Sequence, residues 1–142
     1  TPEDLPYIIS DVLKHETIAQ HVKVINYTLN LSQGLKPVAI IAIEVNGKTY
    51  EGASTGDGQY DAFVKAIRKI YKEQLGRTFP SLTNIPPGGH TDALVQTVIS
   101  WDYNGNILKT QGLDADQMEA AIQATIKMLN LIEDKELNIQ NN

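Results

Sequence analysis

Two stretches of the chain decide its fold: VAIIAIEV-NG-KTYEGAS at 38–54 and DALVQTVISWDY-NG-NILKT at 92–110. Each contains a run rich in β-branched residues, an Asn-Gly dipeptide and a returning arm. Asn-Gly is the strongest short signal for a β-hairpin because both residues accept the positive φ angles of the turn. A glycine and then a helical pattern follow each returning arm, the second of which ends at Gly112. The order strand, hairpin, strand, glycine, helix therefore occurs twice.

Apolar residues at helical spacing predict a helix after each hairpin. The first apolar face consists of Phe63, Ala66, Ile67, Ile70 and Tyr71, and the second of Met118, Ala121, Ile122, Thr125, Ile126 and Leu129. The two patterns share Asp61 with Asp116 and Ala66 with Ala121 at one constant spacing. Asp114 and Gln117 fit a capping box at the start of the second helix.

The segments around these repeats complete the predicted units. Residues 22–31 alternate apolar and polar side chains, which predicts one more strand for the first unit. Its counterpart in the second unit is expected near residues 79–85, in a short stretch that contains Pro80. The following residues 85–90 (IPPGGH) predict a loop, and the polar tail 133–142 is expected to fray.

We therefore predict an α+β fold. It consists of two repeated βββα units, approximately 22–76 and 77–132, whose antiparallel sheets carry the helices on one face. Helical spacing predicts a short N-terminal helix before the first unit; its apolar residues are Leu5, Ile8, Ile9, Val12 and Leu13.

Composition excludes several classes of protein. The chain has 142 residues, no cysteine and a net charge of −5. Disulfides, thiolate metal sites and cysteine nucleophiles are excluded, and the scattered basic residues argue against a nucleic-acid partner. No apolar run approaches the roughly 18 residues that a membrane helix needs. The chain begins at Thr1 without an initiator Met, and we interpret this as the edge of a longer protein.

No motif indicates catalysis, a metal site or a cofactor. His15, His21 and His90 are far apart and form no metal-binding pattern. The stretch GDGQYD at 56–61 has Asp61 where a dinucleotide fingerprint needs Gly or Ala. Two interpretations of this stretch stay open. It is a tight turn with helix capping, or its backbone N–H groups bind a carboxylate at the positive end of the helix dipole.

Three motifs together resemble the regulatory domain of α-isopropylmalate synthases, which citramalate synthases share. They are GDGQYDAF at 56–63, GHTDA at 89–93 and GLDAD at 112–116, and the resemblance covers roughly residues 22–132. The opening residues 4–9 (DLPYII) look like the segment that connects the family's catalytic barrel to this domain. The resemblance thus divides the chain into a connecting segment, 1–21, and a regulatory domain, 22–142.

The resemblance also implies a function. The family's full enzyme, a cytoplasmic acyltransferase, condenses acetyl-CoA with a 2-oxo acid on a metal-dependent barrel, which this chain lacks, so the metal is expected there and no cofactor here. The regulatory domain forms a homodimer and binds a branched-chain amino acid, leucine or isoleucine, as feedback inhibitor. The positions carried over as effector-binding are Gly56, Asp57, Gly58, Tyr60, Asp61, Leu82, Thr91, Asp92, Ala93, Gly112 and Asp114.

Chemistry assigns roles at this site. The effector carboxylate needs backbone donors at the glycine turn, and its ammonium needs Asp57 or Asp61. Its side chain needs an apolar wall, for which Ala62, Ala93 and Leu82 are candidates. We expect the effector to be the main partner of the Asp61 carboxylate. The strand before the second motif is shorter than the family usually has, so either it is truncated or residues are missing near 84–85.

The most favoured function is the leucine-binding regulatory domain of a 2-isopropylmalate synthase. Three alternatives remain open at this point. They are an isoleucine-binding domain of a citramalate synthase, a dimerisation module without effector binding, and a free-standing enzyme.

Overall fold

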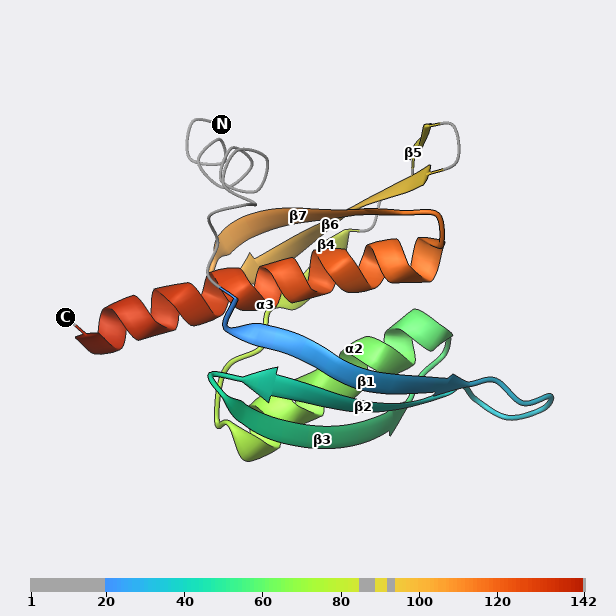
Figure 1. Ribbon diagram of the computed structural model, residues 1–142, viewed down its shortest axis with the longest axis horizontal. Coiled ribbons are helices and arrows are strands. Elements are labelled where there is room, and N and C mark those ends of the chain that lie inside the picture. Colours follow the sequence, from blue (N-terminus) through green and yellow to red (C-terminus); the bar gives the residue numbers. More distant parts are fainter. Residues whose placement is uncertain (1–19, 85–88, 92–93, 142) are drawn as a thin grey trace. The chain divides into compact units, whose positions relative to one another are not determined.

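The computed structural model describes residues 20–84, 89–91 and 94–141. The chain divides into two compact units, which Figure 1 shows in blue to green and in yellow to red. We call His21–Phe79 the first unit and Pro80–Asn142 the second unit. The predicted N-terminal helix at 5–13 and most of the connecting segment lie outside the described residues.

The first unit is a three-stranded antiparallel sheet with a helix on one face (Figure 1). Its elements are β1 (Val22–Asn30), β2 (Val38–Val45), β3 (Lys48–Thr55), α2 (Gln59–Lys69) and the π-helical turn η1 (Ile70–Gln74). Alternate residues of β2, among them Ile41 and Ile43, are buried on the face that α2 covers. The ring of Tyr27 on β1 packs edge-on against Phe63 of α2, with centroids 5.9 Å apart. The sheet is thus half-buried, as the period-two pattern predicts.

The second unit repeats this arrangement around a longer helix. Its elements are β4 (Ser81–Asn84), β5 (Gly89–Thr91), β6 (Leu94–Tyr103), β7 (Asn106–Asp114) and α3 (Gln117–Asn141). β7 pairs with one edge of β6, while β4 and β5 pair with its two ends along the other edge. β4 and β5 together therefore take the place that the unbroken β1 has in the first unit. Trp101 and Ile99 are fully buried under α3.

The predicted α+β fold of two βββα units is confirmed, and both hairpins turn where the sequence places them. Asn46 and Gly47 have φ angles of 51° and 86°, and Asn104 and Gly105 have 54° and 86°. Positive φ at both central residues is the signature of the twist-matched hairpin turn.

Three local predictions are wrong. β5 (Gly89–Thr91) begins inside the stretch predicted as a loop, 85–90, because it pairs with β6. β7 does not end at Gly112 but continues to Asp114. α3 runs on to Asn141 where we expected fraying, since its buried face continues through Ile132 and Glu133.

The spacing of the repeat also differs from the prediction. β3 and β7 begin at Lys48 and Asn106, and α2 and α3 begin at Gln59 and Gln117, so both pairs are 58 residues apart. The predicted match of Asp61 with Asp116 is therefore wrong by three residues. A shift of three residues is nearly one helical turn and brings the same apolar face back, which is why the sequence pattern is ambiguous. The structural counterpart of Asp116 is Gly58.

Candidate functional site

The junction between β3 and α2 contains the first group of predicted site residues. Gly56 is buried, and a Cβ there would overlap the backbone of Ala62 in the first turn of α2. Its N–H donates to the carbonyl oxygen of Pro37 at 3.1 Å. Close packing therefore explains this glycine, and its N–H already has an acceptor.

The carboxylate of Asp61 turns back toward the start of its own helix. It accepts the N–H of Asp57 at 2.9 Å, and Lys65 Nζ lies 3.1 Å away. The Asp57 N–H, helped by Lys65 and opposed by partial burial, lowers the pKa of Asp61 from its ordinary value. Two partners from its own chain thus satisfy Asp61, and the expectation that the effector is its main partner has no support in this geometry.

Asp57 is the more available carboxylate at this junction. Its side chain is 83% exposed, and its ion pair with Lys36 spans 3.6 Å between two exposed groups. Such exposed pairs contribute roughly 0–1 kcal/mol, so a charged ligand can replace this one at little cost. Gly58, the N-cap of α2, has open space around it, and Tyr60 is half-buried. Ala62 is fully buried, so it cannot form the apolar wall expected of it.

The corresponding junction in the second unit is capped differently. Asp116, not the predicted Asp114, is the residue whose carboxylate caps α3, accepting the N–H of Met118 at 2.8 Å. Asp114 accepts the N–H of Asp116 at 3.0 Å and the side-chain amide of Gln123 at 3.3 Å. A Cβ at Gly112 would overlap the carbonyl oxygen of Ala120 in α3. Packing therefore explains this glycine as well.

The strand register places the remaining candidates. Thr91 pairs with Leu94, and Asp114 pairs with the next residue of β6, Val95, so Thr91, Gly112 and Asp114 share one end of the second sheet. Leu82 pairs with Trp101 toward the other end and is 39% exposed. Asp92 and Ala93 lie outside the described residues. The structure thus groups Gly56–Asp61 at one end of the first unit and three of the others at one end of the second.

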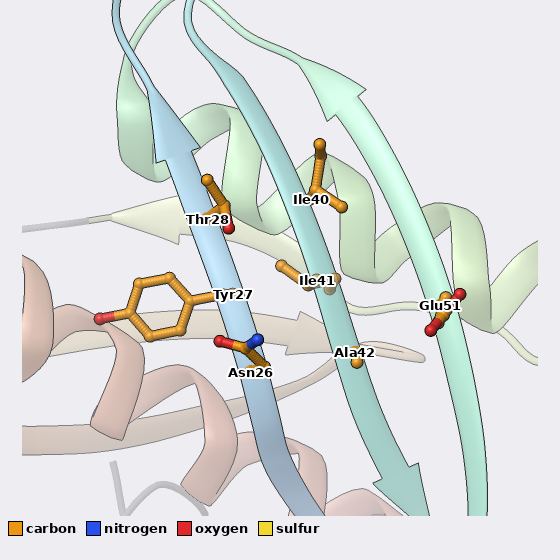
Figure 2. A pocket seen from close by; sticks show the side chains of 7 residues that line it. All are labelled: Asn26, Tyr27, Thr28, Ile40, Ile41, Ala42 and Glu51. Atoms are coloured by element: carbon orange, nitrogen blue, oxygen red, sulfur yellow. The ribbon is translucent and has the colours of Figure 1, made fainter.

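Sequence reasoning missed a depression on the face of the first sheet opposite α2. It has a volume of about 170 Å³ and is lined by Asn26, Tyr27, Thr28, Ile40, Ile41, Ala42 and Glu51 (Figure 2). Of these, Tyr27 packs its ring against Phe63 of α2 and Ile41 is buried on the covered face. Asn26, Ala42 and Glu51 form one row across the three strands. The signal in the sequence is the small residue Ala42, which differs from the other alanine of β2, Ala39, only by lying on the open face, so it becomes informative once the register is known.

Two further features concern the described residues alone. They contain no group of three or more His, Cys, Asp or Glu side chains placed to hold a metal ion. None of their helices is both long and apolar enough to cross a membrane.

Comparison with known proteins identifies the domain. Residues 1–133 match the model of the LeuA allosteric (dimerisation) domain. The chain belongs to this family. The predicted resemblance is confirmed, and its three motifs lie at the β3–α2 junction, around β5 and at the β7–α3 junction of this LeuA allosteric domain.

Relatives of this LeuA allosteric domain include two kinds of named enzyme. The 2-isopropylmalate synthase of Methylococcus capsulatus is 30% identical over 128 residues, 90% of this chain and 24% of the relative. That of Aquifex aeolicus is 29% identical over 128 residues, with the same two shares. The putative (R)-citramalate synthase CimA of Archaeoglobus fulgidus is 27% identical over 132 residues, 93% of this chain and 27% of the relative. The chain thus spans about a quarter of the length of these relatives.

Proposed function

We propose that this chain is the allosteric domain of a 2-isopropylmalate synthase and binds leucine as the feedback inhibitor of leucine biosynthesis. The observation that carries the proposal is the family match over residues 1–133. The parent enzyme would be a cytoplasmic acyltransferase that condenses acetyl-CoA with a 2-oxo acid, with its metal in the catalytic barrel. The domain would act as a homodimer, the commonest closed assembly of soluble proteins.

The first junction offers the charges that a zwitterion requires. Asp57 is the acceptor for the effector ammonium, because its carboxylate is exposed while Asp61 is engaged by its own helix. The effector carboxylate takes backbone donors at Gly58, where the first N–H groups of α2 have no acceptor within the helix. Lys36, 3.6 Å from Asp57, adds a cation on the same side. Tyr60, Leu82, Thr91, Asp92, Ala93, Gly112 and Asp114 stay in the proposal as further effector-binding positions.

Two other functions remain candidates. Isoleucine is the alternative effector, and the similarity to a protein named as a citramalate synthase favours it. A dimerisation module without effector binding is also consistent with the family description.

Thermal unfolding with L-leucine, L-isoleucine, L-valine and D-leucine tests the proposal directly. Ligand at about 100 times its Kd stabilises the fold by roughly 2.7 kcal/mol. For a chain of this size we expect one branched L-amino acid to raise Tm by roughly 5–15 °C. If L-isoleucine stands out, the citramalate synthase alternative is correct. If none of the four changes Tm, the effector function fails and the dimerisation module remains.

Paired variants assign the site. Asp57→Asn should remove most of the ligand-induced shift while leaving the unliganded Tm within a few degrees, because the ion pair of Asp57 with Lys36 is exposed. Glu73→Gln, which neutralises another exposed carboxylate of the same unit, is the matched control and should retain the full shift. A normal ligand shift in Asp57→Asn would show that the ammonium binds elsewhere.

The alternative of a free-standing enzyme has its own assay. The chain incubated with acetyl-CoA and a 2-oxo acid should release CoA at the blank rate, since the described residues hold no metal-binding group. Turnover well above the blank would support the enzyme alternative.

A further inference from the structure

The effector site proposed at the first junction has charged groups but no exposed aliphatic side chain in its own stretch, Gly56–Ala62. Ala62 is fully buried. Of the other residues expected to form an apolar wall, Ala93 lies outside the described residues and Leu82 belongs to the second unit. A branched side chain contributes to binding only where its apolar surface is removed from water. We therefore looked for exposed apolar residues elsewhere in the first unit.

The loop between β1 and β2, residues 31–37, carries two strongly exposed leucines. Leu31 is 68% exposed and Leu35 is 73% exposed, the two largest exposed fractions among the large apolar residues that the structure describes. A single exposed leucine needs no explanation, whereas two on one short loop form an apolar surface that a ligand can cover.

The strand register brings this loop to the first junction. β1 ends at Asn30 and β2 begins at Val38, and these two residues pair. The Gly56 N–H donates to the carbonyl oxygen of Pro37 at 3.1 Å, so the backbone at the end of the loop adjoins the junction. Leu31 directly follows Asn30 and leaves the sheet at the same end. Figure 1 shows the loop extending from the ends of β1 and β2.

An ion pair also connects the loop with the carboxylate proposed to bind the effector ammonium. Lys36 Nζ lies 3.6 Å from Asp57 Oδ1. Leu35 directly precedes Lys36, and its N–H donates to the carbonyl oxygen of Ser32 at 3.1 Å. This hydrogen bond closes a turn in which Gly34 has a φ angle of 79°. Leu35 is thus one residue away from the side chain that contacts Asp57.

We propose that Leu31 and Leu35 form the apolar wall that receives the branched side chain of the effector. The effector ammonium replaces Lys36 at Asp57, since an exposed ion pair contributes little. The branched side chain then covers the two leucines, which removes apolar surface of both partners from water. This inference rests on the proposed function and adds the residues that set its preference for a branched side chain. All of its contacts lie within the first unit.

Isothermal titration calorimetry of the whole chain with L-leucine and L-isoleucine tests the wall. Leu35→Asn should weaken binding of the preferred amino acid roughly 10-fold or more, because an apolar contact of the ligand is lost. Leu35→Met should keep most of the affinity, since Met is apolar and adapts its shape. The matched control is Ile40→Asn, another exposed apolar residue of the same unit, which should bind like the wild type.

The double variant Leu31→Asn with Leu35→Asn should weaken binding further than Leu35→Asn alone, because both leucines contact the ligand. Both residues are largely exposed, so the unliganded Tm should stay within a few degrees of the wild type. Far-UV circular dichroism checks that each variant is folded.

Hydrogen exchange gives a readout that a purely structural role of the loop would not change. In the wild type, the bound amino acid should slow exchange of the backbone amides in residues 31–36, since a covered loop opens less often. The clearest change is expected at Leu35, whose N–H already has an acceptor in Ser32. Unchanged exchange in this loop at saturating ligand would overturn the inference.

The outcomes separate this inference from the proposed function. A wild type that binds neither amino acid would remove the proposed function itself. A wild type that binds, with Asp57→Asn defective but both leucine variants normal, would overturn the wall alone. Equal losses in Leu35→Asn and Ile40→Asn would also overturn it. Leucine variants that lose a dimer seen by sedimentation of the wild type would make the loop an interface between copies, which equally contradicts the inference.

Discussion

The two strand-to-helix junctions use their carboxylates differently, and only the second caps its helix with one. At both helix starts, backbone N–H groups have no intrahelical acceptor. In the first unit the N-cap is Gly58 and no side chain caps the helix, while Asp61 in the first turn accepts the N–H of Asp57, which precedes the helix. In the second unit the carboxylate comes from outside the helix, from Asp116.

This difference decides which junction keeps an available charge. Asp114 in the second unit is held by Asp116 and Gln123, so its carboxylate is part of the fold. The backbone N–H of Asp57 at the first junction donates a hydrogen bond to Asp61, while the Asp57 side chain is 83% exposed. The first junction therefore exposes the carboxylate of Asp57, while the carboxylate of Asp114 at the second junction is engaged by its own chain.

The largest expected effect comes from the close approach of strand and helix in the second unit. Gly112→Val places a side chain where the carbonyl oxygen of Ala120 already lies, so β7 and α3 must separate. We expect a loss of at least about 3 kcal/mol in the free energy of unfolding, measured by urea denaturation.

Gly58→Ala is the contrasting change in the first unit. Its surroundings are open and its φ of −138° suits any residue, so stability should change by no more than about 0.5 kcal/mol. Equal losses in the two variants would contradict the packing difference between the junctions.

The next effect concerns a buried hydrogen-bond chain that only the second unit has. Trp101 Nε1–H donates to Thr110 Oγ1 at 3.1 Å, and that hydroxyl donates to the Ala124 carbonyl at 2.6 Å. The equivalent position in the first unit, 58 residues earlier, is Gly52, where a Cβ would lie 2.7 Å from the side chain of Ile70. The helix thus approaches too closely for a side chain there.

Thr110→Val removes both hydrogen bonds of the Thr110 hydroxyl, including the one that accepts the buried indole N–H of Trp101. We expect a loss of about 2 kcal/mol by chemical denaturation, the usual cost of an unpaired buried donor. Thr110→Ser keeps the hydroxyl and should lose less. If Thr110→Val leaves the free energy of unfolding unchanged, the two hydrogen bonds contribute no net stability.

The fold was largely predictable because its signals are local. Asn46-Gly47 and Asn104-Gly105 turn both hairpins, and period-two alternation places Ile41 and Ile43 inside. β5 was missed because three residues acquire a strand conformation only through pairing with β6. The helix spacing was misread because residues three positions apart share a face.

The candidate site was less predictable than the fold. The sequence predicts that Gly56–Asp61 forms a strand-to-helix junction. It does not reveal that the Asp61 carboxylate accepts a hydrogen bond from the Asp57 N–H. The depression at Ala42 could not be predicted from the sequence, because it depends on which residues of three strands are aligned by the strand register. Local sequence patterns thus identify helices and strands, whereas exposed carboxylates and surface depressions depend on how those helices and strands pack and pair.

The third effect concerns the side-chain cap of α3, which α2 lacks. Asp116→Ala removes the acceptor of the Met118 N–H and should cost about 1 kcal/mol, the usual value of a helix N-cap. Asp116→Ser retains a capping oxygen and should recover most of it. Thermal unfolding measures both, and a larger loss in Asp116→Ser than in Asp116→Ala would rule out the capping role.

A smaller effect is the acid sensitivity of the first unit. The folded pKa of Asp61 is lowered, so its contribution is present above the unfolded pKa and is lost as pH falls through the folded pKa. Asp61→Asn should therefore lower stability slightly at pH 7 and converge with the wild type in acid. Parallel unfolding curves at pH 7 and pH 3 measure this. A difference that grows toward acid would have the wrong sign for the hydrogen bond from Asp57.

The smallest expected loss belongs to Tyr71, a buried tyrosine of the first unit, and the buried Tyr103 of the second unit provides the contrast. Tyr103 in the second unit donates its hydroxyl to Glu136 at 2.6 Å, so Tyr103→Phe should cost about 1.5–3 kcal/mol as the loss of a bond to a charged group. The hydroxyl of Tyr71 in the first unit is buried and has no hydrogen-bond partner among the described residues. Burial raises its pKa, with the charge of Arg77 opposing weakly, so the group stays neutral at ordinary pH.

Tyr71→Phe therefore removes a desolvated polar group while keeping the ring that packs edge-on against Phe79 at 5.7 Å. We expect stability to be unchanged or to rise by up to about 1 kcal/mol, because an unpaired buried hydroxyl costs free energy in the folded state. Denaturation of Tyr71→Phe and Tyr103→Phe side by side measures the contrast, with Tyr103→Phe as the variant that loses a real bond. A loss in Tyr71→Phe as large as that in Tyr103→Phe would show that an ordered water satisfies the Tyr71 hydroxyl, since only a satisfied hydroxyl makes its removal costly.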